Sequence, residues 1–327
     1  MNKTRIWMLA ILFISFAVVS CNKEEEDPIN EAEILIEYLE SMDSPLGKDY
    51  VNTDMAAIKV AEHVRGLNNA GKVYIVDIRS AESFATGHIE NANNVAAGDV
   101  LTHLDAADLS GYDEISIVCY SGQTAGWVTS LLRIAGYDNV YSMKWGMCSW
   151  HEDFAGSWPG NISNGLSALF ESDSPAKDAA SDLPTLSTGK ETGQEILESR
   201  LSTTFAEGFA EAKVSNTEVF ANLDDYYIIN YWAESDYTHY GHVPGAIQYT
   251  PKETIKLTAD LKTLPADKTV VVYCWTGQTS ANMAAYLRLI GYDAKSLLFG
   301  ANGMIYDDLE SHKWSDGAIM GYEYVTD

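Results

Sequence analysis

Two cysteines, Cys119 and Cys274, occur in nearly the same short sequence. Residues 119–125 read C-Y-S-G-Q-T-A, and residues 274–280 read C-W-T-G-Q-T-S. Each copy follows an apolar run typical of a β-strand and precedes an apolar helical stretch that ends in Gly-Tyr-Asp. A cysteine between a strand and a helix lies at the helix N-terminus, where the helix dipole favours the thiolate, the reactive form. The repeat therefore predicts two reactive thiols, 155 residues apart.

The two loops carry no charged side chain, so the backbone must supply the stabilisation of an anion. Successive N–H groups can surround a sulfur as an anion nest, and Gly122 and Gly277 permit the unusual dihedral angles that this requires. We therefore expect the loop to lower the pKa of each thiol. Twelve loop residues are candidates for contact with a small anion: Tyr120, Ser121, Gly122, Gln123, Thr124, Ala125, Trp275, Thr276, Gly277, Gln278, Thr279 and Ser280.

Some of these side chains have alternative roles. The glutamines and threonines could form hydrogen bonds within their own loop, as short polar side chains in turns often do. Tyr120 and Trp275 could either form a wall of a substrate pocket or pack on the neighbouring half of the chain.

The elements around the cysteines are also repeated in the same order. Strand-like and helical stretches alternate in both halves, which predicts an α/β fold with a mainly parallel sheet flanked by helices in each half. Three further features recur in both halves. Asp77 and Arg79 after the first strand correspond to Asn230 and Trp232. A Gly-His turn at 87–89 corresponds to 241–243, and a late Gly-Met element at 146–147 corresponds to 303–304.

These repeats divide the chain into two domains, at 48–157 and 192–327. Residues 158–191 are rich in Gly, Ser, Asp, Pro and Asn, as expected of a linker. Residues 22–47 form a polar tether followed by an amphipathic stretch at 31–42, which we expect to be an extra helix packed on the first domain.

The arrangement resembles the rhodanese family of sulfurtransferases. The D-x-R pair Asp77 and Arg79, the Gly-His turns, the cysteine loops and the Gly-Met elements followed by Trp150 or Tyr306 carry this resemblance. It implies two tandem rhodanese-like domains that need no cofactor or metal. It also implies double displacement, in which thiosulfate or a similar donor loads the cysteine as a persulfide and a thiol or cyanide removes the sulfur.

The resemblance assigns Asp77 and Arg79 a supporting role beneath the Cys119 loop, although an ordinary surface ion pair is the alternative. Copy two has Asn230 and Trp232 instead, so Cys119 is the better catalytic candidate and Cys274 the second. A non-catalytic binding module and a persulfide redox sensor remain open as other functions. Cys148 could resolve a persulfide on Cys119, or it could be a small buried hydrophobic residue.

Two other cysteine chemistries fit less well. Related phosphatases close the loop with an arginine that clamps phosphate, whereas here Thr124-Ala125 and Thr279-Ser280 stand at the closing positions. A Cys-His hydrolase could use the repeated histidines as general bases. In the rhodanese family, however, a histidine at this position belongs to a structural turn, and the resemblance implies that role for His88 and His242.

Composition limits the partners. The chain has 21 basic and 47 acidic residues, a formal net charge of −26, which argues against nucleic acid and anionic lipid surfaces. The four cysteines are Cys21, Cys119, Cys148 and Cys274, and no C-x-x-C or zinc-like Cys-His spacing is present. The expected partners are therefore a small sulfur-containing anion and its thiol or cyanide acceptor.

The first 21 residues resemble a lipoprotein signal peptide. Lys3 and Arg5 precede an uncharged, mostly apolar run at 6–19, and the sequence V-V-S-C at 18–21 resembles a lipobox that makes Cys21 the lipidation site. An ordinary signal peptide is the alternative. The following N-K-E-E-E-D resembles the surface-export signal of Bacteroidetes lipoproteins, or serves as a solvated tether. We expect an exported protein anchored by lipid in the cell envelope, at the outer membrane, on its periplasmic or surface face.

Overall fold

Each half of the chain contains one five-stranded parallel sheet in the computed structural model, which describes residues 30–51 and 57–327. The first sheet has the order β1-β5-β4-β2-β3, and the second repeats it as β6-β10-β9-β7-β8. All the neighbouring strands pair in parallel. The predicted α/β fold with two parallel sheets is confirmed. The strands are β1 (Ile58–Lys59), β2 (Val73–Asp77), β3 (Asn93–Asn94), β4 (Glu114–Val118), β5 (Val140–Met143), β6 (Lys213–Val214), β7 (Tyr226–Asn230), β8 (Ile247–Gln248), β9 (Thr269–Tyr273) and β10 (Ala294–Leu297).

The two cysteines follow the central strand of their sheets, β4 and β9. Ile115, Ile117 and Val118 of β4 are buried, as are the valines of β9, because helices cover both faces of a parallel sheet. The helices are α1 (Glu31–Leu39), α2 (Ala61–Asn69), α3 (Ala81–Thr86), α4 (Val100–Ala106), α5 (Gln123–Ile134), α6 (Gly193–Glu211), α7 (Asn216–Ala221), α8 (Glu234–Tyr240) and α9 (Gln278–Leu289).

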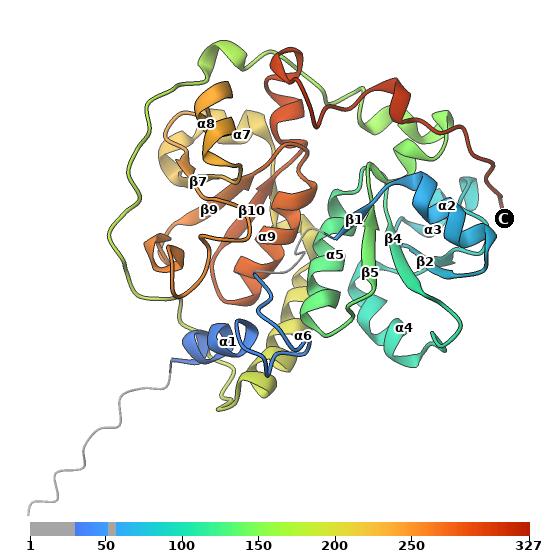
Figure 1. Ribbon diagram of the computed structural model, residues 1–327, viewed down its shortest axis with the longest axis horizontal. Coiled ribbons are helices and arrows are strands. Elements are labelled where there is room, and N and C mark those ends of the chain that lie inside the picture. The colour runs from blue at the N-terminus through green and yellow to red at the C-terminus, as the bar shows by residue number, and fades with distance from the viewer. Residues whose placement is uncertain (1–29, 52–56) are drawn as a thin grey trace, which may run out of the picture.

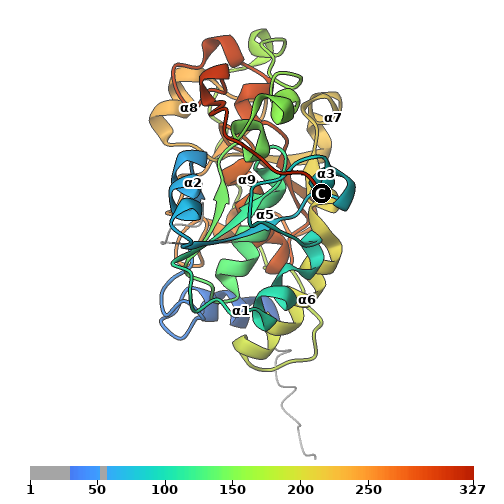
Figure 2. The same cartoon turned by 90° about the vertical axis from the view of Figure 1, so that its right-hand side faces the viewer.

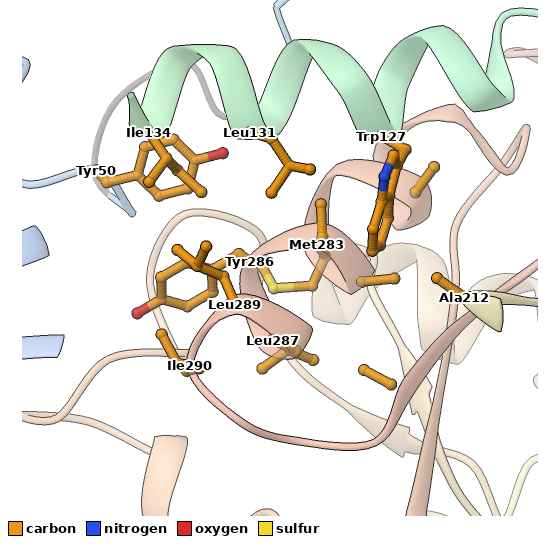
Figure 3. Close-up of a cluster of buried hydrophobic side chains, with 14 of the residues drawn as sticks. Tyr50, Trp127, Leu131, Ile134, Ala212, Met283, Tyr286, Leu287, Leu289 and Ile290 are labelled. Atoms are coloured by element: carbon orange, nitrogen blue, oxygen red, sulfur yellow. The ribbon is translucent and has the colours of Figure 1, made fainter. Parts of the chain in front are cut away.

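Helices α5 and α9 pack against each other between the two sheets (Figure 1). Trp127, Leu131 and Ile134 of α5 face Met283 and Tyr286 of α9 in a continuous buried cluster (Figure 3). A helix that is buried almost all round belongs in the interior of a large core. The helices that begin at the two cysteine loops therefore also join the two halves.

The extra helix forms as α1, but the expectation that it packs on the first domain is wrong. It packs against α6 of the second half (Figure 2). The Glu31 carboxylate accepts hydrogen bonds from the backbone N–H groups of Thr188 and Gly189, at 2.6 and 2.8 Å. These bonds satisfy a buried carboxylate beside the chain that leads into α6, and they hold α1 there.

The expected signal segment and the proposed lipidation site Cys21 lie outside the described residues. Within 30–51 and 57–327, none of the helices is both long and apolar enough to cross a bilayer.

The segment that follows each cysteine-bearing half crosses to the other half. After the first half, the N–H of Ser163 donates to the Asn302 carbonyl at 3.0 Å, and Glu171 forms an antiparallel bridge with His242. After the second half, Val325 forms the corresponding bridge with His88. The C-terminus consequently lies beside α3 of the first half (Figures 1 and 2). Each Gly-His turn is therefore held by the segment that follows the other half.

The C-terminal segment is expected to stabilise the first half, although it follows the second in sequence. The Tyr322 ring is buried, 5.1 Å from the Trp150 ring and 4.1 Å from the Arg65 guanidinium group. Replacing it by alanine should lower the free energy of unfolding by about 3 kcal/mol, because it leaves a cavity. Hydrogen exchange should then increase around β2 and α3. Met320→Ala, in the same segment but with an exposed side chain, should change stability by less than about 0.5 kcal/mol. Faster exchange confined to the second half would contradict this prediction.

Candidate active site

The Cys119 thiol lies in a turn of backbone N–H groups where β4 leads into α5. Its Sγ accepts hydrogen bonds from the N–H groups of Gly122 and Ala125, at 3.2 and 3.3 Å. Gly122 has φ +86°, a left-handed conformation that favours glycine. The side chain is buried, with 5% of the residue exposed. This is the geometry of an anion nest around a sulfur.

The Cys274 thiol occupies the same place between β9 and α9, with different contacts. Its Sγ accepts a hydrogen bond from the Ser280 N–H at 3.3 Å and also lies 3.6 Å from the Ser280 hydroxyl. That hydroxyl pairs with Ser296 at 2.8 Å. Ala125 stands at the corresponding position of copy one, so a hydroxyl contact to sulfur is specific to the second loop.

A second tight turn supports each cysteine loop from below. Trp145 and Gly146 are both left-handed, and so are Phe299 and Gly300. The Met147 N–H donates to the Cys119 carbonyl at 2.8 Å. A Cβ on Gly146 would overlap that carbonyl, so only glycine fits there.

The prediction that Gly303-Met304 is the counterpart of this turn in copy two is wrong, because the turn lies three residues earlier. The N–H of Ala301 donates to the Cys274 carbonyl at 3.0 Å, and a Cβ on Gly300 would overlap that carbonyl. Gly300-Ala301 is therefore the counterpart of Gly146-Met147. The close approach of the backbone requires the glycine, whereas the next residue contributes its backbone N–H and can be methionine or alanine.

Asp77 and Arg79 form a buried ion pair at the carboxyl end of β2. The Arg79 Nη2 lies 2.6 Å from Asp77 Oδ2 and donates to the Gly87 carbonyl at 2.8 Å, and each charged side chain is 1% exposed. The guanidinium group lies 5.2 Å from the ring of Tyr120, which follows the cysteine. The pair thus links the Gly-His turn to the Cys119 loop. It is not the surface pair that the sequence left open.

Copy two replaces this ion pair by neutral groups. The Asn230 side chain donates to the Tyr273 hydroxyl at 2.8 Å, and Trp232 stacks on Trp275 with ring centroids 4.0 Å apart. Trp275 is also stacked on His312 at 5.2 Å. An aromatic stack therefore covers the second loop. In the first loop, the corresponding place is taken by the Arg79 cation, which faces the Tyr120 ring.

The two loop glutamines point into the opposite half. Gln123 Oε1 accepts the Phe299 N–H at 2.8 Å, and Gln278 Oε1 accepts the Trp145 N–H at 3.3 Å. Within its own loop, Gln123 also donates to the Ser121 hydroxyl at 3.1 Å. Both side chains are buried.

The three loop threonines lie where each loop leads into its helix. The Thr276 hydroxyl accepts the Gln278 N–H at 3.3 Å. Thr124 and Thr279 are half-buried, each at the second residue of its helix.

The repeated histidines belong to buried turns. His88 stacks on Phe84 with ring centroids 3.6 Å apart, and its Nδ1 lies 2.9 Å from the Phe84 carbonyl. His242 stacks on Tyr237 at 4.1 Å. His88 Nε2 also lies 4.0 Å from Asp327 Oδ1 in the C-terminal segment. Both rings are thus packed on the helix that precedes their turn, which fits the structural role that the resemblance implies.

The net effect on the Cys119 pKa is opposite to the sequence expectation. Burial raises the pKa above its ordinary value, and the nearby Asp77 carboxylate adds to this, although hydrogen bonds from Ala125, Gly122 and Ser121 lower it. The neutral thiol needs no solvation, whereas a thiolate at this depth loses its water. The loop therefore offsets part of the burial penalty but does not remove it.

Cys148 lies beneath the first loop in an aromatic cluster that sequence reasoning missed. It is fully buried with Trp145, Trp158 and Trp314, and burial raises its pKa to about 11. Trp158 lies in the stretch expected as linker, and its indole N–H donates to the Ser121 carbonyl at 3.2 Å. The Gly/Ser/Asp-rich composition of that stretch indicated a linker, although Trp158 within it contacts and supports the loop.

A cavity of about 650 Å³ opens beside Tyr120. It is lined by residues from four parts of the chain, including Thr86, Phe154 and Tyr324. Among the residues that the structure describes, no cluster of His, Cys, Asp and Glu could hold a metal ion. Tyr120, which follows Cys119, is the residue of the cysteine loop that lines this cavity.

Comparisons with known proteins agree on one family for this chain. A profile described as a rhodanese-like domain matches the chain twice, at residues 60–153 and 215–304, together more than half of its length. The thiosulfate sulfurtransferase GlpE of Shewanella oneidensis is 35% identical over 86 residues, 26% of this chain and 83% of that protein. The same enzyme of Pseudomonas fluorescens is 32% identical over 106 residues, 32% of this chain and 91% of that protein.

Solved structures include SseA from Escherichia coli, described as a 3-mercaptopyruvate sulfotransferase. It is 16% identical, with a TM-score of 0.28, and the match covers 80% of this chain and 100% of that one. The human single-domain sulfurtransferase TSTD1 is 24% identical, with a TM-score of 0.23, and the match covers 27% of this chain and 88% of that one. On the two profile matches, which include both cysteine loops, the chain belongs to the family of rhodanese-like domains.

Proposed function

We propose that this protein is a sulfurtransferase that carries sulfane sulfur as a persulfide on Cys119. The observation that supports this most directly is the Cys119 Sγ, which accepts two backbone hydrogen bonds above the buried Asp77–Arg79 pair. The thiosulfate sulfurtransferases among the relatives support thiosulfate as a donor.

The reaction proceeds in two displacements. The Cys119 thiolate attacks the outer sulfur of thiosulfate, the sulfur–sulfur bond of the donor breaks, and sulfite leaves with the electron pair. The new persulfide carries one negative charge on its outer sulfur, which remains near the N–H groups of the loop. Cyanide or a thiolate then attacks that outer sulfur, and the Cys119 thiolate is regenerated.

The first copy is the principal site in this proposal because a buried cation, Arg79, lies beside its loop. Arg79 faces the Tyr120 ring and is itself fixed by Asp77 and the Gly87 carbonyl. In the second copy Trp232 takes that place, and the Ser280 hydroxyl contacts the sulfur. Cys274 is a second, weaker site in this proposal.

Activity should depend mainly on Cys119. In a thiosulfate–cyanide assay on the protein without residues 1–21, Cys119→Ser should lower the rate by at least about 100-fold, because serine cannot form a persulfide. Cys274→Ser should lower it by less than about threefold, and the double variant should be inactive. Mass spectrometry of the loaded protein should show one added sulfur, removable by dithiothreitol, on the Cys119 peptide. A protein that loads no sulfur from any common donor, with both thiols free, would instead favour a binding module.

Loading should accelerate as the pH rises. The attacking species is the thiolate, and burial holds the pKa of Cys119 above its ordinary value. The loading rate should therefore rise about tenfold per pH unit between pH 6 and pH 8, without a plateau, since only a small fraction is ionised there. Stopped-flow loading with thiosulfate at a series of pH values measures this. A plateau below pH 7.5 would show that the loop outweighs burial.

We further propose that the protein is a lipoprotein of the cell envelope, on the basis of the run at 6–19 and Cys21. Cells grown with a clickable fatty acid should label the full-length protein, and Cys21→Ser should abolish that label while the precursor accumulates. Protease treatment of intact cells then distinguishes a surface face from a periplasmic face. Labelling that persists in Cys21→Ser would rule out this lipidation site.

A further inference from the structure

The hydrogen bonds of the two loop glutamines form a reciprocal pair across the α5–α9 contact. Gln123 follows Cys119 by four residues, yet its Oε1 accepts the N–H of Phe299 in the second half. Gln278 follows Cys274 by four residues, and its Oε1 accepts the N–H of Trp145 in the first half. Trp145 and Phe299 begin the turns that support the cysteine carbonyls. Each glutamine thus holds the supporting turn of the opposite cysteine.

Steric fit ties the same side chains to the opposite loops. A Cβ on Gly122 would overlap the side-chain amide of Gln278, and a Cβ on Gly277 would overlap that of Gln123. Gly122 is one of the two residues whose N–H groups donate to the Cys119 sulfur. The glutamine of one half therefore lies against the backbone that surrounds the thiol of the other.

One donor in this arrangement is unused. The Nε2 of Gln278 is buried against Gly122, and among residues 30–51 and 57–327 it has no hydrogen-bond partner. A buried donor that makes no hydrogen bond has lost its water without compensation, which is unfavourable. The amide places the positive end of a dipole beside the Cys119 loop, and an anion held there would interact favourably with it.

We propose that Gln278 is a positioning residue for Cys119, and Gln123 for Cys274, so that each cysteine loop is completed by the other half of the chain. Together they couple the two thiol sites, because a change in one loop moves the turn beneath the other cysteine. This inference rests on the proposed role of both loops as thiol sites. It does not depend on which donor loads them.

Several ionisable groups near the two thiols affect how readily each thiol loses its proton. Asp77 of β2 adds to the raised pKa of Cys119, and Cys119 in turn adds to the raised pKa of Cys148 in the supporting turn. The Arg79 guanidinium group faces the ring of Tyr120, which follows Cys119. Tyr231 lies near Cys274. A new carboxylate at position 278 would add a negative charge beside the first loop, whereas one at position 123 would add it beside the second.

The experiment is a pulse of iodoacetamide, with the alkylation of the Cys119 and Cys274 peptides followed separately by mass spectrometry between pH 7 and pH 10. Gln278→Glu keeps the acceptor for the Trp145 N–H. It should slow alkylation of Cys119 about tenfold at pH 8 and that of Cys274 less than about twofold, because a like charge disfavours the thiolate. Gln123→Glu should show the reverse preference. Gln278→Met, which removes the amide without adding charge, should shift the Cys119 pH profile upward by a smaller amount.

Ser130→Ala provides the matched control. The Ser130 hydroxyl donates to the Asn282 carbonyl at 2.9 Å across the same helix pair, farther from the cysteine loops. Its loss should change both cysteines equally or not at all. The proposal is overturned if each glutamate variant affects the cysteine of its own loop more, if both cysteines change together as in Ser130→Ala, or if neither changes. No sulfur donor is used, so a failed sulfurtransferase assay leaves this result unaffected.

Discussion

The packing of α5 against α9 is the contact on which the rest of the structure depends. Both helices are buried almost all round, so neither can complete its core without the other. Because each helix begins at a cysteine loop, the packing that joins the halves also brings the two loops side by side. The support of each loop by the opposite half, through Gln123 and Gln278, follows from this geometry.

One backbone plan serves two chemically different sites. Both loops have a left-handed glycine, a supporting turn that donates to the cysteine carbonyl, and a helix that begins four residues after the sulfur. The side chains beneath them differ, with a buried ion pair in the first and an amide with an aromatic stack in the second. An ion pair at this depth would be costly to break, because one charge would remain unpaired. The first site is therefore the more rigidly specified.

Burial and hydrogen bonding oppose each other at Cys119. The N–H groups of the loop favour an anion, but the depth of the sulfur disfavours it, and burial is the larger effect on the thiol. The same depth keeps water from a sulfur carried there. The loop hydrogen bonds therefore reduce the cost of a negative charge on this sulfur, and burial sets the cost that remains.

The sequence by itself determined the repeat, the α/β class and the positions of the cysteine loops, because strand–turn–helix patterns depend on local composition. It also indicated that Asp77 and Arg79 act together. The tertiary structure alone decided the net pKa of Cys119, since burial is a property of the whole fold, and it corrected the counterpart of Gly146 to Gly300, where backbone approach sets the requirement. Contacts between distant segments include the packing of α1 on α6 and the hydrogen bonds of Gln123 and Gln278 to the opposite half. These contacts depend on how the two halves pack together, which a local sequence pattern does not predict.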